Sequence, residues 1–178
     1  MASSTSQTVQ SSFSSPCSKP RPENDVFLSF RGEDTRDNFT DHLYHALKGK
    51  GFSTFKNDKE LEPGNPISPK LLDAIEKSRI AVIVFSKNYA SSPWCLEELV
   101  KIVKCMKGGL RVLPIFYHVD PSHVRHQNET FAVAFDEHGK RLQENLEKVQ
   151  IWRDALRVVA NLSGKTLTNG YHLLIFFY

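Results

Sequence analysis

The chain has 178 residues with 40% hydrophobic and 24% charged residues, enough for one globular domain with a buried core, and this composition excludes a disordered chain. Its net charge of +3 is too small to favour a nucleic-acid-binding protein, and no apolar run approaches the ~20 residues of a membrane-spanning helix. The three cysteines have no CxxC spacing, which favours a reducing compartment over a disulfide framework or a zinc site.

Residues 1–24 are rich in Ser, Thr, Gln and Pro and lack the apolar core of a secretory signal. They predict a disordered leader, with a plastid transit peptide as the alternative. The run 25–30 predicts a first buried strand, and the charged run 31–36 predicts a polar loop. A helix is expected next, because apolar residues recur there at helical spacing: Phe39, Leu43, Ala46 and Leu47.

A short second strand is expected at 52–55, followed by an exposed loop at 59–66 whose Pro and Gly residues mark a turn. Ser68-Pro69 and Ser92-Pro93 each predict a helix start, since a hydroxyl caps a helix and proline suits its first position. The run 80–85 between them is wholly apolar and rich in β-branched residues, which predicts a third strand buried on both faces.

The helix after Pro93 carries two adjacent glutamates that its periodicity separates. Its apolar face is formed by Cys95, Leu99, Ile102, Val103 and Met106. Glu97 points away from this face and is expected to pair in solvent with Lys101. Glu98 lies at the edge of the face, where partial desolvation suits a carboxyl for chemistry. The alternative for Glu98 is a side chain that simply reaches water.

The second half of the chain continues the alternation of strands and helices. A fourth strand is expected at 110–117, in which Pro114 indicates a bulge or an edge. A turn at 120–122, a short helix at 131–138, a longer helix at 149–159 and a fifth strand at 163–167 follow. This order predicts an α/β fold, with a parallel sheet and helices on both of its faces.

Three histidines and one cysteine are not predicted to have a chemical role. His118, His123 and His126 lie near Asp120, but no matching ligand run occurs elsewhere, so surface histidines are favoured over a metal site. Cys95 lies in the first turn of its helix, where a thiolate would be stabilised, yet it is on the apolar face. A buried, unreactive thiol is therefore expected.

Taken together, these segments resemble the plant Toll/interleukin-1 receptor (TIR) domain of intracellular immune receptors. The resemblance runs from about Asp25 to Gly164 and implies a flavodoxin-like fold with strand order 2-1-3-4-5. In that order the ligand crevice lies at the carboxyl ends of strands one and three. Five motifs in the family's order carry the resemblance: DVFLSFRGEDTR (25–36), the loop 60–67, ISPKLLDAIEKSRIAVIVFS (67–86), NYASSPWCLEEL (88–99) and LPIFYHVDPSHVR (113–125).

Members of this family cleave NAD⁺ between nicotinamide and ribose, often forming cyclic ADP-ribose-type nucleotides. The resemblance implies that this chain is an NAD⁺ glycohydrolase that consumes NAD⁺ as a substrate, with NADP⁺ as an alternative, and needs no cofactor or metal. The family's active-site glutamate falls on Glu98. The chain has no G-x-G-x-x-G after its first strand, which argues against a dehydrogenase.

The expected NAD⁺-binding residues follow the first and third strands. Arg31 and Arg36 are expected to meet the pyrophosphate or, alternatively, to pair with nearby carboxylates. Trp94 and Phe30 either stack on a nucleotide ring or belong to the core, and Gly64 either permits a close approach or only forms a turn. The expected set is Phe30, Arg31, Gly32, Glu33, Asp34, Thr35, Arg36, Gly64, Ser86 and Trp94.

The resemblance also implies partners and a cellular place. Asp41 and His42 stand where many plant members carry Ser-His on a self-association face, so TIR–TIR homo- or hetero-oligomers are expected. Lipase-like plant immune proteins are expected downstream, through the nucleotide product, in the cytoplasm or nucleus. A non-catalytic adaptor or decoy that acts only through TIR–TIR association is the alternative function.

The chain departs from the family at its end. The TIR domain is expected at 25–168, with an atypical apolar tail at 169–178 in place of the family's final amphipathic helix. This tail has no charge or proline and forms an aggregation-prone window. We therefore expect a TIR-only or truncated product, either a weak enzyme alone or a partner of full-length relatives.

Overall fold

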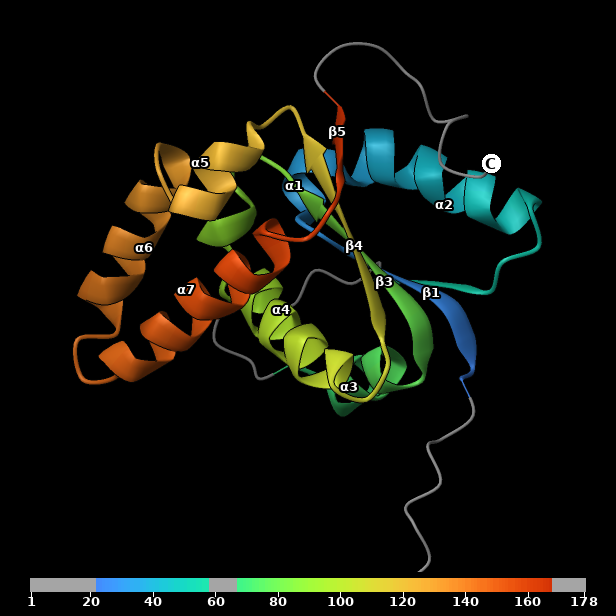
Figure 1. The fold of residues 1–178 in the computed structure, drawn as a ribbon, viewed down its shortest axis with the longest axis horizontal. Helices are drawn as coiled ribbons and strands as arrows, with labels where there is room; N and C mark the ends of the chain where they lie inside the picture. The colour runs from blue at the N-terminus through green and yellow to red at the C-terminus, as the bar shows by residue number, and fades with distance from the viewer. Residues whose placement is uncertain (1–21, 58–66, 168–178) are drawn as a thin grey trace, which may run out of the picture.

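A five-stranded parallel sheet organises the computed structural model, which describes residues 22–57 and 67–167 (Figure 1). Its strand order, β2-β1-β3-β4-β5, confirms the expected winding. The boundaries differ from expectation by one or two residues. The strands are β1 (Asn24–Phe30), β2 (Thr54–Lys56), β3 (Ser78–Phe85), β4 (Arg111–Tyr117) and β5 (Lys165–Leu167). The leader 1–21, Gly64 and the tail 169–178 lie outside the described residues.

Two helices begin at the Ser-Pro signals that the sequence supplies. The hydroxyl of Ser68 accepts a hydrogen bond from the amide of Leu71 at 3.3 Å, and that of Ser92 accepts from Cys95 at 3.4 Å. Both expected helix starts are therefore confirmed. The helical segments are α1 (Gly32–Thr35), η1 (Arg36–Thr40), α2 (Asp41–Gly49), α3 (Pro69–Glu76), η2 (Tyr89–Ser91), α4 (Pro93–Met106), α5 (Pro121–His126), α6 (Thr130–Arg141) and α7 (Leu146–Ala160).

Two local predictions were wrong. The run 31–36 is not a loop: it forms α1 and enters the π-helical turn η1, with two acidic residues in the first turn that suit the helix dipole. The turn at 120–122 begins α5, because the carboxylate of Asp120 accepts from the amide of Ser122 at 2.7 Å and caps that helix. The helix expected at 131–138, in contrast, is confirmed as part of the longer α6.

The expected pair between Glu97 and Lys101 was also wrong. Glu97 pairs with Lys148 of α7, and Lys101 pairs with Glu76 of α3. Both neighbouring helices pack against α4, so their charged side chains reach its surface and replace the within-helix partner. Within residues 22–57 and 67–167, none of the helices combines the length and apolarity that crossing a membrane requires.

Each face of the sheet has its own apolar cluster. On one face, α2 packs on Val26, Leu28 and Phe30 of β1, together with alternate residues of β3. On the other face, α3, α4 and α7 pack on Phe27 and the intervening residues (Figure 1). Because successive side chains of a strand point to opposite faces, Ser29 of β1 lies on the α4 side. This alternation decides which strand residues reach Glu98.

Pro114 was expected at a bulge or an edge, and the register separates these alternatives. The pairing of β3 with β4 runs without interruption from Ile80 to Phe85, so these two strands contain no bulge. The pairing of β4 with β5 begins only at Ile115. Pro114 therefore faces a local edge of β4, where its missing N–H costs no ladder hydrogen bond.

Gly164 packs against β4 at this edge, and we expect its replacement by alanine to destabilise the protein. A Cβ at this position would lie 2.5 Å from the carbonyl oxygen of Pro114 and 3.0 Å from the Phe116 ring. Overpacking of this kind costs roughly 1–3 kcal/mol of unfolding free energy, measurable by urea denaturation. Gly139→Ala in α6 is the control, because its Cβ meets nothing within 4 Å and should stabilise the helix. Equal effects of the two variants would contradict this expectation.

Candidate active site

The carboxyl ends of β1 and β3 lie side by side, with Phe30 paired to Val84 in register. The chain leaves β1 into α1, and it leaves β3 into the loop that leads to η2 and α4. This is the edge at which the sheet order reverses, where open α/β sheets hold their ligands. The structure thus brings the segments 31–36 and 86–98 together, as the sequence predicts.

Glu98 of α4 is buried beneath this edge with 6% of its surface exposed. The hydroxyl of Ser29 lies 2.9 Å from its Oε2 atom and donates to it when the carboxyl is ionised. Burial raises the pKa of Glu98 to about 8, against the opposing effect of this hydrogen bond. Glu98 therefore lies deeper than the helix edge that its position predicted. Glu97, by contrast, is 31% exposed and pairs with Lys148.

Ser29 and Tyr89 are two residues of the site that sequence reasoning missed. The hydroxyl of Tyr89 lies 3.0 Å from that of Ser29 and donates to the carbonyl oxygen of Cys95 at 3.1 Å. Both side chains are fully buried. One signal was available, because Ser29 is the single polar residue within the apolar run 26–30 and lies on the same face as Phe27.

Cys95 occupies the buried position that the sequence favoured. Its thiol is 3.6 Å from the carbonyl oxygen of Phe30, and burial together with the nearby Glu98 raises its pKa well above the usual range. A thiol held in its protonated form is a poor nucleophile. The prediction of a buried, unreactive Cys95 agrees with this environment.

Asp34 joins the two segments at the mouth of the site. It accepts hydrogen bonds from the Ser86 hydroxyl at 2.6 Å, from the backbone N–H of Asn88 at 3.1 Å and from Nη1 of Arg31 at 2.7 Å. Burial alone would raise the pKa of Asp34, but the bonds from Ser86 and Asn88 and the charge of Arg31 outweigh it and lower that pKa. Asp34 thus fixes α1 against the loop that follows β3.

Asp34→Ala is expected to lower the unfolding free energy by about 1–3 kcal/mol, because it removes the acceptor of the buried Ser86 hydroxyl and of the Arg31 guanidinium. Urea denaturation measures this change. The exposed Asp37 in the following turn supplies the matched control, and Asp37→Ala should change stability by less than about 0.5 kcal/mol. An Asp34 variant as stable as the Asp37 variant would show that the three hydrogen bonds contribute nothing.

Three other expected binding residues lie in or directly before α1 and pack against neighbouring side chains. Arg31 forms ion pairs with Glu33 and Asp34, as its alternative interpretation required. The guanidinium of Arg36 packs against Gly32, at a distance where a Cβ on residue 32 would require the Arg36 side chain to move. The hydroxyl of Thr35 is buried and lies 2.8 Å from that of Thr40.

The two aromatic residues differ in their surroundings. Phe30 is 8% exposed and packs in the core beneath α2, on the opposite face of β1 from Ser29. Trp94 is half-buried in the first turn of α4, next to the buried Cys95. Only Trp94 therefore keeps part of its ring available to a ligand.

On α2, the carboxylate of Asp41 is bound to Lys56 of β2 at 3.0 Å and lies 3.5 Å from His45. The hydrogen bond from Lys56 lowers the pKa of Asp41. His42 beside it is exposed. The expected self-association pair thus has one member held within the chain and one that faces solvent.

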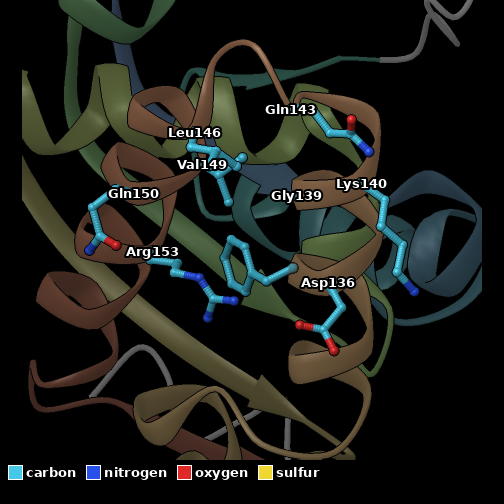
Figure 2. A pocket seen from close by; sticks show the side chains of 9 residues that line it. Asp136, Gly139, Lys140, Gln143, Leu146, Val149, Gln150 and Arg153 are labelled. Carbon is cyan, nitrogen blue, oxygen red and sulfur yellow. The ribbon is translucent and has the colours of Figure 1, made fainter.

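A separate groove of about 440 Å³ lies between α6 and α7 (Figure 2). The guanidinium of Arg153 lies over the Phe135 ring there, 4.4 Å from its centre, and Asp136 and Lys140 line the same groove. None of the expected site residues that the structure describes lines it. Among the described residues, no group of three or more His, Cys, Asp or Glu side chains is arranged to hold a metal ion.

Comparison with known proteins places this chain in a family. Residues 23–174 match the family model described as TIR domain. The chain is 59% identical over 151 residues to the disease resistance protein RUN1 of Vitis rotundifolia, and 55% identical over 151 residues to the TMV resistance protein N of Nicotiana glutinosa. These matches cover 83% and 84% of this chain but only 11% and 13% of those relatives.

A third relative, the disease resistance protein RPV1 of Vitis rotundifolia, is 54% identical over 175 residues, which is 98% of this chain and 12% of that relative. Among solved structures, the TIR domains of the activated Roq1 resistosome, which recognises the pathogen effector XopQ, superpose with a TM-score of 0.74 at 57% identity. This match covers 83% of this chain and 90% of the other. The chain therefore belongs to the TIR domain family, and its relatives are plant disease resistance proteins.

Proposed function

We propose that this protein is an NAD⁺ glycohydrolase that cleaves the bond between nicotinamide and ribose at the carboxyl ends of β1 and β3. One observation carries the proposal: Glu98 is a buried carboxyl whose pKa is raised to about 8, beneath the edge at which the sheet order reverses. Carboxyl groups with such shifts, placed where a fold holds its ligands, are typical of catalytic sites.

A single carboxylate is sufficient for this reaction. Nicotinamide in NAD⁺ is a cationic leaving group, so it departs with the electron pair of the C1′–N bond and needs no general acid. The ionised Glu98 carboxylate stabilises the positive charge that develops on the ribose. Water then adds to C1′, and its proton is transferred to Glu98 or to solvent. The products are nicotinamide and ADP-ribose, and attack by another group of the nucleotide would give a cyclic product.

The residues around the mouth would hold the rest of NAD⁺. Arg31 meets the pyrophosphate by exchanging its present ion pairs with Glu33 and Asp34 for phosphate oxygens. Trp94 offers the face of a half-buried ring for stacking on a base. Arg36 packs beside Gly32 at the start of the same segment and supplies a second positive charge.

Self-association is the second part of the proposal. The Roq1 TIR domains belong to an activated resistosome, and this chain matches them at 57% identity. We propose that this chain also forms homo- or hetero-oligomers with TIR domains, through the α2 surface that carries His42. The nucleotide product would then reach lipase-like immune proteins in the cytoplasm or nucleus. The bond between Asp41 and Lys56 keeps one carboxylate of this surface neutralised.

Nicotinamide release from NAD⁺ by the wild-type chain tests this proposal. The chain is measured alone, at low and high concentration, and fused to a scaffold that holds several copies together. We expect turnover that rises with assembly. Absence of nicotinamide release in every form would overturn the proposal and favour a non-catalytic adaptor that acts through TIR–TIR contacts.

A further inference from the structure

Four oxygen atoms beneath the site form one continuous chain of contacts. Oε2 of Glu98 is 2.9 Å from the hydroxyl of Ser29, which is 3.0 Å from the hydroxyl of Tyr89, which is 3.1 Å from the carbonyl oxygen of Cys95. The residues come from α4, β1 and η2, and the three polar side chains are buried. Each hydroxyl has one proton, so the protons available decide which contacts are hydrogen bonds.

When Glu98 is protonated, every contact can be a hydrogen bond. The carboxyl donates to Ser29, Ser29 donates to Tyr89, and Tyr89 donates to the carbonyl of Cys95. When Glu98 is ionised, Ser29 must donate to the carboxylate, because an ionised carboxylate only accepts. Two protons then serve three contacts, so either the pair of Ser29 with Tyr89 or the pair of Tyr89 with Cys95 loses its bond.

We propose that Ser29 and Tyr89 are positioning residues that hold the Glu98 carboxyl through a chain of hydroxyls, in which Ser29 donates to Tyr89 when Glu98 is protonated and to Glu98 when it is ionised. Ser29 supports the ionised form by donating to it directly. Tyr89 supports the protonated form, because it accepts the proton that Ser29 then directs away from Glu98. The two hydroxyls therefore act in opposite senses on the same carboxyl. This inference rests on the proposed function only for its catalytic consequence.

Two other buried ionisable groups near Glu98 do not change charge in the same range. Burial raises the pKa of the Tyr89 hydroxyl and of the Cys95 thiol well above their usual values, so both remain neutral. Arg31 and Asp34, which face Cys95 from α1, pair with each other.

The charged groups that α3 and α7 bring to α4 are also paired. Glu76 of α3 is bound by Lys101, and Lys148 of α7 is bound by Glu97. Among these groups, Glu98 is therefore the one whose gain or loss of a proton changes the hydrogen bonds of Ser29 and Tyr89.

The test is the pKa of Glu98 itself, measured by NMR on protein labelled with ¹³C at the glutamate carboxyls, with the Glu98 signal identified by its loss in Glu98→Gln. Ser29→Ala removes the donor to the carboxylate and should raise this pKa by about one unit. Tyr89→Phe leaves the Ser29 proton without an acceptor in the protonated form and should lower it by about half a unit to one unit.

Two further variants serve as controls. Ser78→Ala removes another buried hydroxyl, which donates to the Ala74 carbonyl at 2.7 Å near the opposite end of β3, and should leave the pKa unchanged. Ser29→Thr keeps a hydroxyl and should return the pKa toward that of the wild type. If Ser29→Ala does not fold, the isosteric Tyr89→Phe decides the matter alone.

A Tyr89→Phe variant whose pKa is unchanged or raised would overturn the inference, as would shifts in the same direction for Ser29→Ala and Tyr89→Phe. The measurement needs no NAD⁺, so it stands whether or not nicotinamide is released. If the protein is the enzyme proposed, the pH midpoint of kcat/KM should move with the NMR values, up for Ser29→Ala and down for Tyr89→Phe.

Discussion

Glu98→Gln is expected to lower the rate of nicotinamide release by at least about 100-fold, because the variant keeps the shape of the side chain and removes the charge that stabilises the developing oxocarbenium ion. Loss of general-base assistance to water would add to this effect. The rate is measured as nicotinamide formed per chain at saturating NAD⁺.

Glu97→Gln is the matched control for that result. Glu97 is adjacent in sequence but 31% exposed, and it pairs with Lys148 on the surface of α4. Its replacement should change the rate by less than about twofold, because an ion pair on the surface contributes little to the free energy of the folded protein and loss of this pair should leave the site intact. A loss in the Glu97 variant equal to that of the Glu98 variant would show that the activity depends on the helix surface or its assembly and not on the buried carboxyl.

Glu98→Gln is also expected to stabilise the protein, increasingly as the pH rises. The pKa of Glu98 is about 8 in the folded protein, against its ordinary value of 4.5 in the unfolded chain. Between these values the folded state binds more protons than the unfolded state, so the stability of the wild type falls as pH rises through this window. One pKa unit corresponds to about 1.4 kcal/mol. Across the range between these two pKa values, the wild type therefore loses roughly 3–5 kcal/mol of unfolding free energy. The Glu98→Gln variant does not lose it, because glutamine is uncharged.

Urea denaturation at pH 5 and pH 8 measures this effect as the difference between Glu98→Gln and the wild type. The difference removes contributions from other groups, notably the buried His138, whose lowered pKa makes the folded protein less stable as the pH falls below about 6.5. Glu97→Gln should follow the wild type at both values. A stability difference between Glu98→Gln and the wild type that is the same at pH 5 and pH 8 would contradict the raised pKa.

Much of the fold follows from local sequence signals. The apolar runs predict the three longer strands β1, β3 and β4. The Ser-Pro pairs predict the starts of α3 and α4, because capping involves residues only three positions apart. Helical periodicity also separates Glu97 from Glu98 correctly. The strand order, in contrast, came from the family resemblance, since no local pattern fixes which strands are neighbours.

The depth of the site could not be predicted from the helix alone. Periodicity places Glu98 at the edge of an apolar face, but its burial is decided by β1 and η2, which contribute Ser29 and Tyr89 from 69 and 9 positions away. The same limit applies to Asp34, whose partners Ser86 and Asn88 lie 52 and 54 positions along the chain. Contacts of this range depend on the topology of the sheet, so the hydrogen bonds of Asp34 could not be predicted from its local sequence.

The pH dependence of kcat/KM for nicotinamide release by the wild-type chain, measured from pH 6 to pH 9 in its assembled form, tests most directly whether the buried Glu98 carboxyl performs the cleavage. Release by Glu98→Gln at each pH supplies the background. We predict that kcat/KM rises about tenfold per pH unit at low pH and levels off near pH 8, as Glu98 ionises. A value that does not change between pH 6 and pH 9, or that equals the background throughout, would contradict this assignment.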